Sequence, residues 1–152
     1  MAVTIGKWWS IRAGNIPTTA LLWAGSALLA WSAVVHYHLW LSEGYRNIPT
    51  IGPLFLAQAI VAAAFAVLTA VTRRFVPALA SAGLLVASIG ALLISSWWGL
   101  FGWQESLGAP YVSLALAVEG AGAVLLAAGC LVMARPLVSR LSSGHRSGPL
   151  PA

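Results

Sequence analysis

The stretch PLFLAQAIVAAAFAVLTAVTRRFVPALASAGLLVASIGALLISSWWGL, residues 53–100, decides the fold class. It contains two apolar runs, 53–72 and 77–100, separated by a tight turn that carries Arg73 and Arg74. A hydrocarbon core of about 30 Å needs roughly 20 helical residues to cross it, and each run is long enough. The stretch therefore predicts two transmembrane helices joined by a short basic turn.

Two further apolar runs of the same kind lie on either side of this pair. The whole chain of 152 residues is 60% hydrophobic and 7% charged, with a mean hydropathy of +0.89, which leaves too little polar surface for a soluble globule. We therefore predict an all-α, polytopic membrane protein built as a four-transmembrane-helix bundle. The expected segments are an interfacial N-terminal segment 1–17, helices 18–41, 53–72, 77–100 and 110–134, and a disordered basic tail 135–152.

The basic residues predict the orientation of the bundle. One side would hold Lys7, Arg12, Arg73, Arg74, Arg135, Arg140 and Arg146, and the other side only Arg46. The positive-inside rule then places both termini in the cytoplasm of a multi-pass plasma-membrane protein. Residues 30–32 resemble a signal-peptide cleavage site, but the apolar run continues to Leu41, too long for a typical signal core. The net charge of +5 reflects this topology and contact with anionic lipids, not nucleic acid.

Glu119 is the polar residue that bears most directly on function. A carboxylate near the bilayer centre costs roughly 2.5 to 3.5 kcal/mol to insert, so it should face protein, water or a ligand. At 1.5 Å per residue it lies about 13 Å below the outer end of its helix. The other polar candidates also fall in the outer half: Ser32 near the level of Glu119, and His36, Gln58, Ser95 and Ser96 above it.

Two interpretations of this cluster stay open. In the first, Glu119 forms the floor of a polar pocket that opens outward, with the other candidates on its walls. In the second, Glu119 is a neutral carboxyl that donates one interhelical hydrogen bond, to Ser32 or to His36. Ser32 and His36 are four residues apart and share one helix face, so either partner is within reach of the same carboxyl.

Aromatic residues gather at the same end of the bundle. Tryptophan and tyrosine favour the membrane interface, so the simplest interpretation is an interfacial belt. The alternative is an aromatic cap over the pocket. The candidates are Trp40, Trp97, Trp98, Trp103 and Tyr111. In the first loop, Glu43 and Arg46 are spaced to form an ion pair if the helix extends that far.

Several functional classes are disfavoured by residue content and spacing. The chain has one cysteine, Cys130, and no aspartate, so it offers neither a thiol pair nor a Ser-His-Asp triad. His36 and His38 lie on different helix faces, so a two-histidine haem site would need a second copy of the chain. We therefore expect no catalytic site, no metal site and no assigned cofactor.

Three stretches carry a resemblance to a known group of proteins. They are HYHLWLSEGYRNIPTIGPLFLAQA (36–59), WWGLFGWQES (97–106) and PYVSLALAVEG (110–120). Together they resemble small four-helix integral membrane proteins of actinobacteria, a group without an assigned activity. The resemblance implies a cell type but no mechanism.

The sequence thus favours a non-enzymatic membrane protein. We expect an accessory subunit or a bundle that binds a small apolar ligand, such as a lipid or a quinone. The expected partners are membrane lipids and other membrane proteins or a second copy of the chain, and no nucleic acid. The alternative is a small transporter or channel that uses Glu119 as a proton or cation site. The inner half of the bundle has almost no polar residues, which disfavours a transport path.

Overall fold

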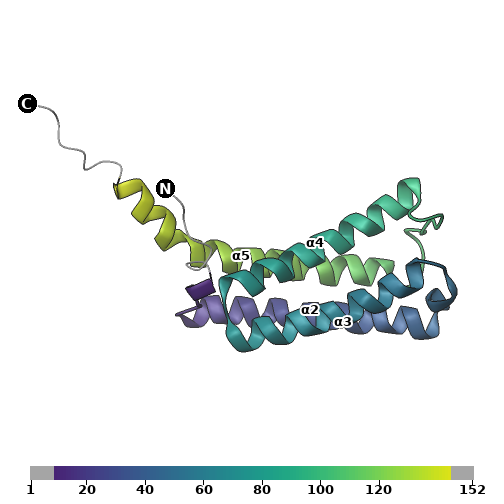
Figure 1. Ribbon diagram of the computed structural model, residues 1–152, viewed down its shortest axis with the longest axis horizontal. Coiled ribbons are helices and arrows are strands. Elements are labelled where there is room, and N and C mark those ends of the chain that lie inside the picture. The colour runs from purple at the N-terminus through teal and green to yellow at the C-terminus, as the bar shows by residue number, and fades with distance from the viewer. Residues whose placement is uncertain (1–8, 145–152) are drawn as a thin grey trace, which may run out of the picture.

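The computed structural model describes residues 9–144, with side chains described up to residue 136. Four helices form a bundle: α2 (Ile16–Ser42), α3 (Ile51–Thr72), α4 (Phe75–Trp98) and α5 (Val112–Gly144), with a short 3-10 helix η1 (Tyr45–Asn47) in the first loop (Figure 1). Each of the four is long and apolar enough to cross a membrane. The predicted all-α class and four-helix bundle are confirmed, and the chain is an integral membrane protein.

Local signals at the helix ends explain where the helices begin and end. The Asn15 side chain accepts a hydrogen bond from the backbone N–H of Thr18 at 2.9 Å and caps the start of α2. Helix α3 is followed by the capping residue Arg73, whose backbone adopts the left-handed conformation, and α4 is followed by Gly99 with φ of 79°. Such conformations stop a helix, and glycine adopts them without strain.

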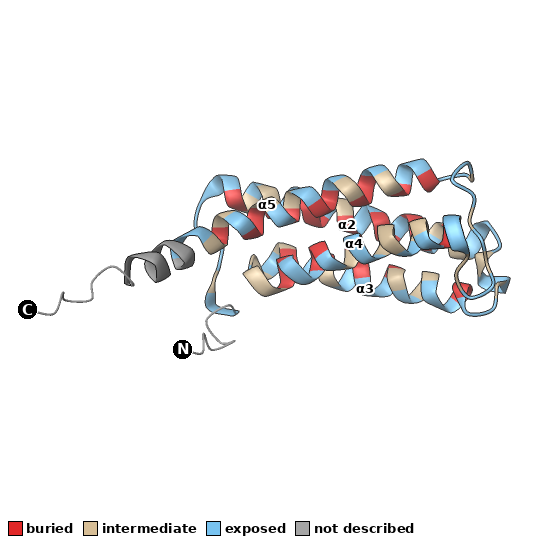
Figure 2. Cartoon of the chain, turned by 90° about the horizontal axis from the view of Figure 1, so that it is seen from above, coloured by how far each residue is buried: buried red, intermediate tan, exposed pale blue. Residues whose placement is uncertain are grey.

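The helices pack in the order α3, α2, α5, α4 around the bundle, with a smaller contact that closes the ring between α3 and α4. Buried positions run along all four helices, while exposed positions cover the sides that would meet lipid (Figure 2). Two glycines allow close helix packing, Gly25 between α2 and α5, and Gly122 between α5 and both α4 and α2. A Cβ at Gly25 would lie 2.6 Å from Leu126 Cγ, and one at Gly122 would lie 2.8 Å from Leu85 Cδ1.

The two ends of the bundle are distinct. We call the end with the start of the described chain and the α3–α4 turn the terminal end, and the end with the two longer connections the loop end. At the terminal end, the N–H of Ala13 donates to the carbonyl of Arg73 and the N–H of Phe75 donates to that of Ile11, at 3.0 and 3.1 Å. The start of the described chain is therefore hydrogen-bonded to the α3–α4 turn. The loop end carries the two longer connections, 43–50 and 99–111 (Figure 1).

Helix α4 separates from the rest of the bundle toward the loop end. In the terminal half it is joined to α3 by a hydrogen bond between the hydroxyls of Thr69 and Ser81, at 2.9 Å. From Leu85 onward α4 has no buried residue until Ser95, and its loop-end portion rises away from α2 and α3 (Figure 1). This divergence opens the space in which the pocket lies.

The helix boundaries agree with the predicted spans to within two residues, except at the C-terminus. Helix α5 continues to Gly144, so the expectation of a disordered tail is wrong for residues 135–144, and residues 145–152 lie outside the described part of the chain. Apolar residues at 137, 138 and 141 continue the helical spacing past Pro136. A proline inside a helix typically kinks it, and α5 bends away from the bundle in its last turns (Figure 1).

Candidate ligand pocket

A cavity of about 270 Å³ occupies the loop-end half of the bundle. All four helices contribute to its walls, and both loops contribute to its upper part. Most of the lining is apolar, which is typical of sites for small organic molecules. The polar and ionisable side chains that line it are His36, Tyr45, Gln58, Ser88, Ser95, Trp103, Glu105, Tyr111 and Glu119.

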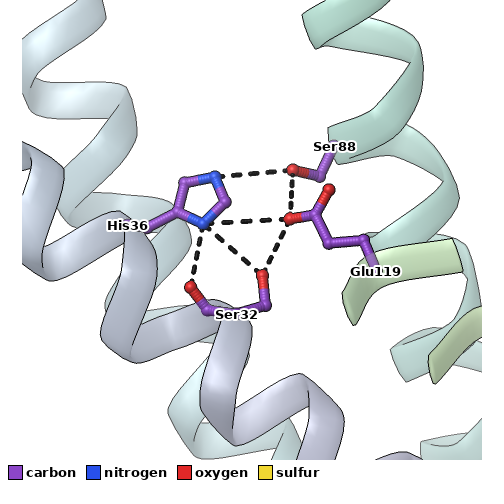
Figure 3. Close-up of polar contacts among 4 residues, drawn as sticks. All are labelled: Ser32, His36, Ser88 and Glu119. Carbon is purple, nitrogen blue, oxygen red and sulfur yellow. Dashed lines mark hydrogen bonds and ion pairs between the residues drawn. The ribbon is translucent and has the colours of Figure 1, made fainter. Parts of the chain in front are cut away.

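Glu119 lies at the floor of this pocket, and only 1% of its surface is exposed. Its Oε1 accepts a hydrogen bond from Ser32 Oγ on α2 at 2.8 Å and another from Ser88 Oγ on α4 at 2.9 Å (Figure 3). His36 Nδ1 lies 3.8 Å from the same oxygen. One carboxylate oxygen of α5 is therefore held from both neighbouring helices.

The contacts of His36 fix one of its ring hydrogens. Nδ1 lies 2.9 Å from the backbone carbonyl of Ser32, and because a carbonyl only accepts, Nδ1 carries a hydrogen (Figure 3). Nε2 lies 3.5 Å from Ser88 Oγ, whose single hydroxyl hydrogen already points to Glu119. Ser88 Oγ therefore contacts both Nε2 of His36 and Oε1 of Glu119 and bridges the two side chains.

Two polar atoms at the pocket have no partner in the described part of the chain. Glu119 Oε2 makes no hydrogen bond there, while Oε1 receives both serine hydroxyls (Figure 3). Gln58 Nε2 is buried and also makes no hydrogen bond. A buried polar group without a partner costs about 1 to 3 kcal/mol. The pocket therefore contains an acceptor, Glu119 Oε2, that a bound molecule would satisfy, and Gln58, which lines it, has a buried donor without a partner.

An aromatic lid, which we define as Tyr45, Phe55 and Trp103 together with Glu105, covers the loop end of the pocket. The hydroxyl of Tyr45 donates to Glu105 Oε2 at 2.6 Å, and Trp103 Nε1 donates to the same oxygen at 3.4 Å. The Tyr45 ring stacks on Phe55 with 4.5 Å between centroids. Burial raises the pKa of Tyr45 above its ordinary value, and the hydrogen bond to Glu105 raises it further. The lid thus joins η1, α3 and the second loop.

The structure brings most of the predicted polar candidates together. Glu119, His36, Gln58 and Ser95 line the pocket. Ser32 is buried beside it and contacts both Glu119 and His36. Ser96 is the exception, because its hydroxyl is turned back to the carbonyl of Leu92 in its own helix, at 2.9 Å.

The predicted aromatic cap divides into two groups. Trp103 and Tyr111 line the pocket, whereas Trp40, Trp97 and Trp98 do not. Trp97 and Trp98 are 60% and 76% exposed and meet each other edge to face, which suits the interfacial belt.

The expected ion pair between Glu43 and Arg46 is absent from the described residues. Glu43 Oε1 instead lies 3.7 Å from Nε2 of His38. Helix α2 ends at Ser42, and Gly44 has φ of 82°, so the backbone turns before Arg46. The two residues therefore do not share a helical turn, which the predicted pairing required.

Sequence reasoning missed Ser88 and Phe55, and it assigned neither Tyr45 nor Glu105 a contact in the lid. Ser88 had a usable signal, because it precedes Ser95 by seven residues, or two helical turns, and so shares its face. The contact between Tyr45 and Phe55 had no such signal in the sequence, because it depends on how the first loop folds back over α3. Within the described residues, no three His, Cys, Asp or Glu side chains gather as metal ligands would.

Comparisons of the chain with protein-family models, with curated proteins and with solved structures gave no match. Any function must therefore be argued from the pocket itself, from its apolar walls, its carboxylate floor and its aromatic lid.

Proposed function

We propose that this integral membrane protein binds a small, mostly apolar molecule of the lipid or quinone kind, and acts as a binding or accessory subunit without an enzymatic reaction of its own. One observation carries the proposal: an apolar cavity that contains an unpartnered acceptor, Glu119 Oε2, and an unpartnered buried donor, Gln58 Nε2. Burying polar groups without partners costs free energy, and a ligand that completes these hydrogen bonds removes part of that cost.

The competing function is a proton- or cation-coupled transporter. The serine-bridged contact between His36 and Glu119 favours it, because such a chain can hold and pass a proton. A transport path must also reach the other side of the membrane. Toward the terminal end, however, the bundle is filled by a hydrophobic core in which Leu22, Leu85 and Leu126 are fully buried. This packing supports a site that is closed toward the terminal end.

A pocket-filling substitution tests the proposed function. Ala91 on α4 lines the pocket, whereas Ala80 on the same helix is exposed and lies outside it. Native mass spectrometry of protein released from native membrane discs should show a bound small molecule on the wild type. Ala91→Trp should lose this molecule, because the indole occupies its space, and Ala80→Trp should retain it.

Two results would contradict the proposal. The first is a wild-type protein with no bound mass beyond the loosely held lipids that also accompany Ala91→Trp. The second is an Ala91→Trp variant that folds and still carries the same molecule at the same occupancy.

A further inference from the structure

We infer that the occupant is a neutral hydroquinone-type molecule, a flat ring with hydroxyl groups and an apolar tail, that reaches the pocket sideways between α3 and α4. The inference rests on the proposed function and names the substrate class of the same site. Four features of the pocket support the inference: its hydrogen-bonding atoms without a partner, its charge, its aromatic wall and its lateral opening.

Two unpartnered atoms, one in the pocket and one buried in a side chain that lines it, favour a ligand that both donates and accepts. Glu119 Oε2 needs a donor and Gln58 Nε2 needs an acceptor. A phenolic hydroxyl does both, since it has one hydrogen and two lone pairs. A hydroquinone has two such groups, whereas the oxidised quinone has only acceptors and cannot donate to an oxygen of Glu119.

The charge of the lining disfavours an anionic head group. Glu105 and Glu119 both line the pocket, and no Lys or Arg is among its lining residues in the described chain. His36 is the lining side chain of the described chain that is able to carry a positive charge, and it already contacts Glu119. A phosphate would therefore lie against two carboxyl groups with no cation of its own.

An organic cation fits less well than a neutral phenol. Both oxygens of Glu105 already accept hydrogen bonds, Oε2 from Tyr45 and Oε1 from the backbone N–H of Ser106 at 3.0 Å. A quaternary ammonium also has no acceptor to offer Gln58. Attraction to the carboxylates alone would leave the buried amide unsatisfied.

The wall beside these groups suits a flat ring. Phe55 lies between two other rings, with centroids 4.5 Å from Tyr45 and 5.2 Å from His36. Trp103 meets Tyr45 edge to face at 6.2 Å. Aromatic rings prefer such offset or tilted arrangements, so a further ring can join this group.

The pocket is open on the side where α4 separates from α3. Leu54 on α3 and Ala87 and Ala91 on α4 line the pocket and are also exposed on the surface of the bundle. In a membrane this surface faces lipid, because both helices are long and apolar enough to cross the bilayer. A ligand head can therefore lie at Glu119 while its tail extends between α3 and α4 into the bilayer.

The test uses the full chain in phosphatidylcholine nanodiscs and four probes: decylhydroquinone kept reduced with ascorbate, its dimethyl ether, phosphatidylglycerol and decyltrimethylammonium. Binding is titrated by native mass spectrometry, and binding to Ala91→Trp is subtracted as the background. Decylhydroquinone should bind at least about tenfold more tightly than its dimethyl ether, because the ether cannot donate a hydrogen bond to Glu119.

Two glutamine variants locate the contact. Gln58→Leu should weaken decylhydroquinone binding about three- to tenfold through loss of one neutral hydrogen bond. Gln104→Leu is the matched control, because the amide of Gln104 lies outside the pocket and donates to the carbonyl of Ser96. It should leave the binding unchanged.

The outcomes separate the inference from the proposed function. If phosphatidylglycerol or decyltrimethylammonium binds above background and decylhydroquinone does not, the ligand class is wrong while the pocket remains a binding site. Equal affinity for decylhydroquinone and its dimethyl ether would also overturn the inference. If no probe binds above background and the native protein carries no small molecule, both the inference and the proposed function are wrong.

Discussion

At the scale of single residues, the geometry of Glu119 accounts for a carboxylate inside a membrane-spanning helix. Two serine hydroxyls and a histidine ring surround one of its oxygens, so part of the hydration lost on burial is replaced by protein donors. The second oxygen is left toward the pocket. A residue with only a packing role would be expected to have both oxygens satisfied within the bundle.

Gln58 provides a stability test of the same idea. Its buried Nε2 has no partner, so Gln58→Leu should remove an unsatisfied group and raise the melting temperature of the ligand-free protein. A gain of about 1 kcal/mol corresponds to roughly 2 to 4 °C in a chain of this size. Circular dichroism melts in detergent measure the effect. A lower melting temperature for Gln58→Leu would show that the amide is satisfied and contributes to the fold.

At the scale of helices and loops, close packing of α5 depends on a glycine. A Cβ at Gly122 would meet Leu85 Cδ1 at 2.8 Å and Leu28 Cβ at 3.3 Å, whereas a Cβ at Gly120 would meet nothing within 4 Å. Gly122→Leu should therefore destabilise the bundle by about 1 to 3 kcal/mol. Gly120→Leu, on the open side of the same helix, is the control. Equal melting temperatures for the two variants would contradict the packing described for α2, α4 and α5.

The aromatic lid makes a prediction for alkaline pH. Because the pKa of Tyr45 is raised, its hydrogen bond to Glu105 should be intact below the ordinary tyrosine pKa of about 10 and lost only as the pH rises through the higher folded value. An absorbance titration of phenolate should show a late component above the usual range. Tyr45→Phe should remove that component, and Tyr37→Phe should leave it in place. A late component that persists in Tyr45→Phe would rule out the assignment.

The helices were predictable from the sequence for a clear physical reason, and the site only in part. The length of an apolar run sets a transmembrane span, and residue spacing sets depth, so Glu119, His36 and Gln58 could be placed at one end of the bundle. The rotation of each helix could not be derived, because α3 and α4 are apolar on nearly all sides. For this reason Ser96 was included and Ser88 was missed. The extension of α5 past Pro136 could not be predicted from composition, because residues 141–152 are rich in Gly, Ser and Pro, which is typical of a disordered tail.

At the scale of the whole molecule, the orientation in the membrane stays a prediction from the basic residues. Backbone hydrogen bonds join the start of the described chain to the turn at Arg73, so these segments lie at one end of the bundle. In a Cys130→Ala background, Asn47→Cys and Ser106→Cys at the loop end should react with an impermeant maleimide in intact cells. Arg74→Cys at the terminal end should react only after permeabilisation. The reverse pattern would invert the orientation.

The pocket is also a property of the whole molecule, since its floor comes from α5, its walls from all four helices and its lid from both loops. The central claim about this pocket is that a bound molecule contacts Glu119. The most direct measurement is a difference infrared spectrum recorded when the co-purified molecule is extracted and added back. We predict a carboxyl or carboxylate band that changes on binding, is lost in Glu119→Gln and persists in the exposed control Glu43→Gln. Saturated binding with no band that depends on Glu119 would contradict the account.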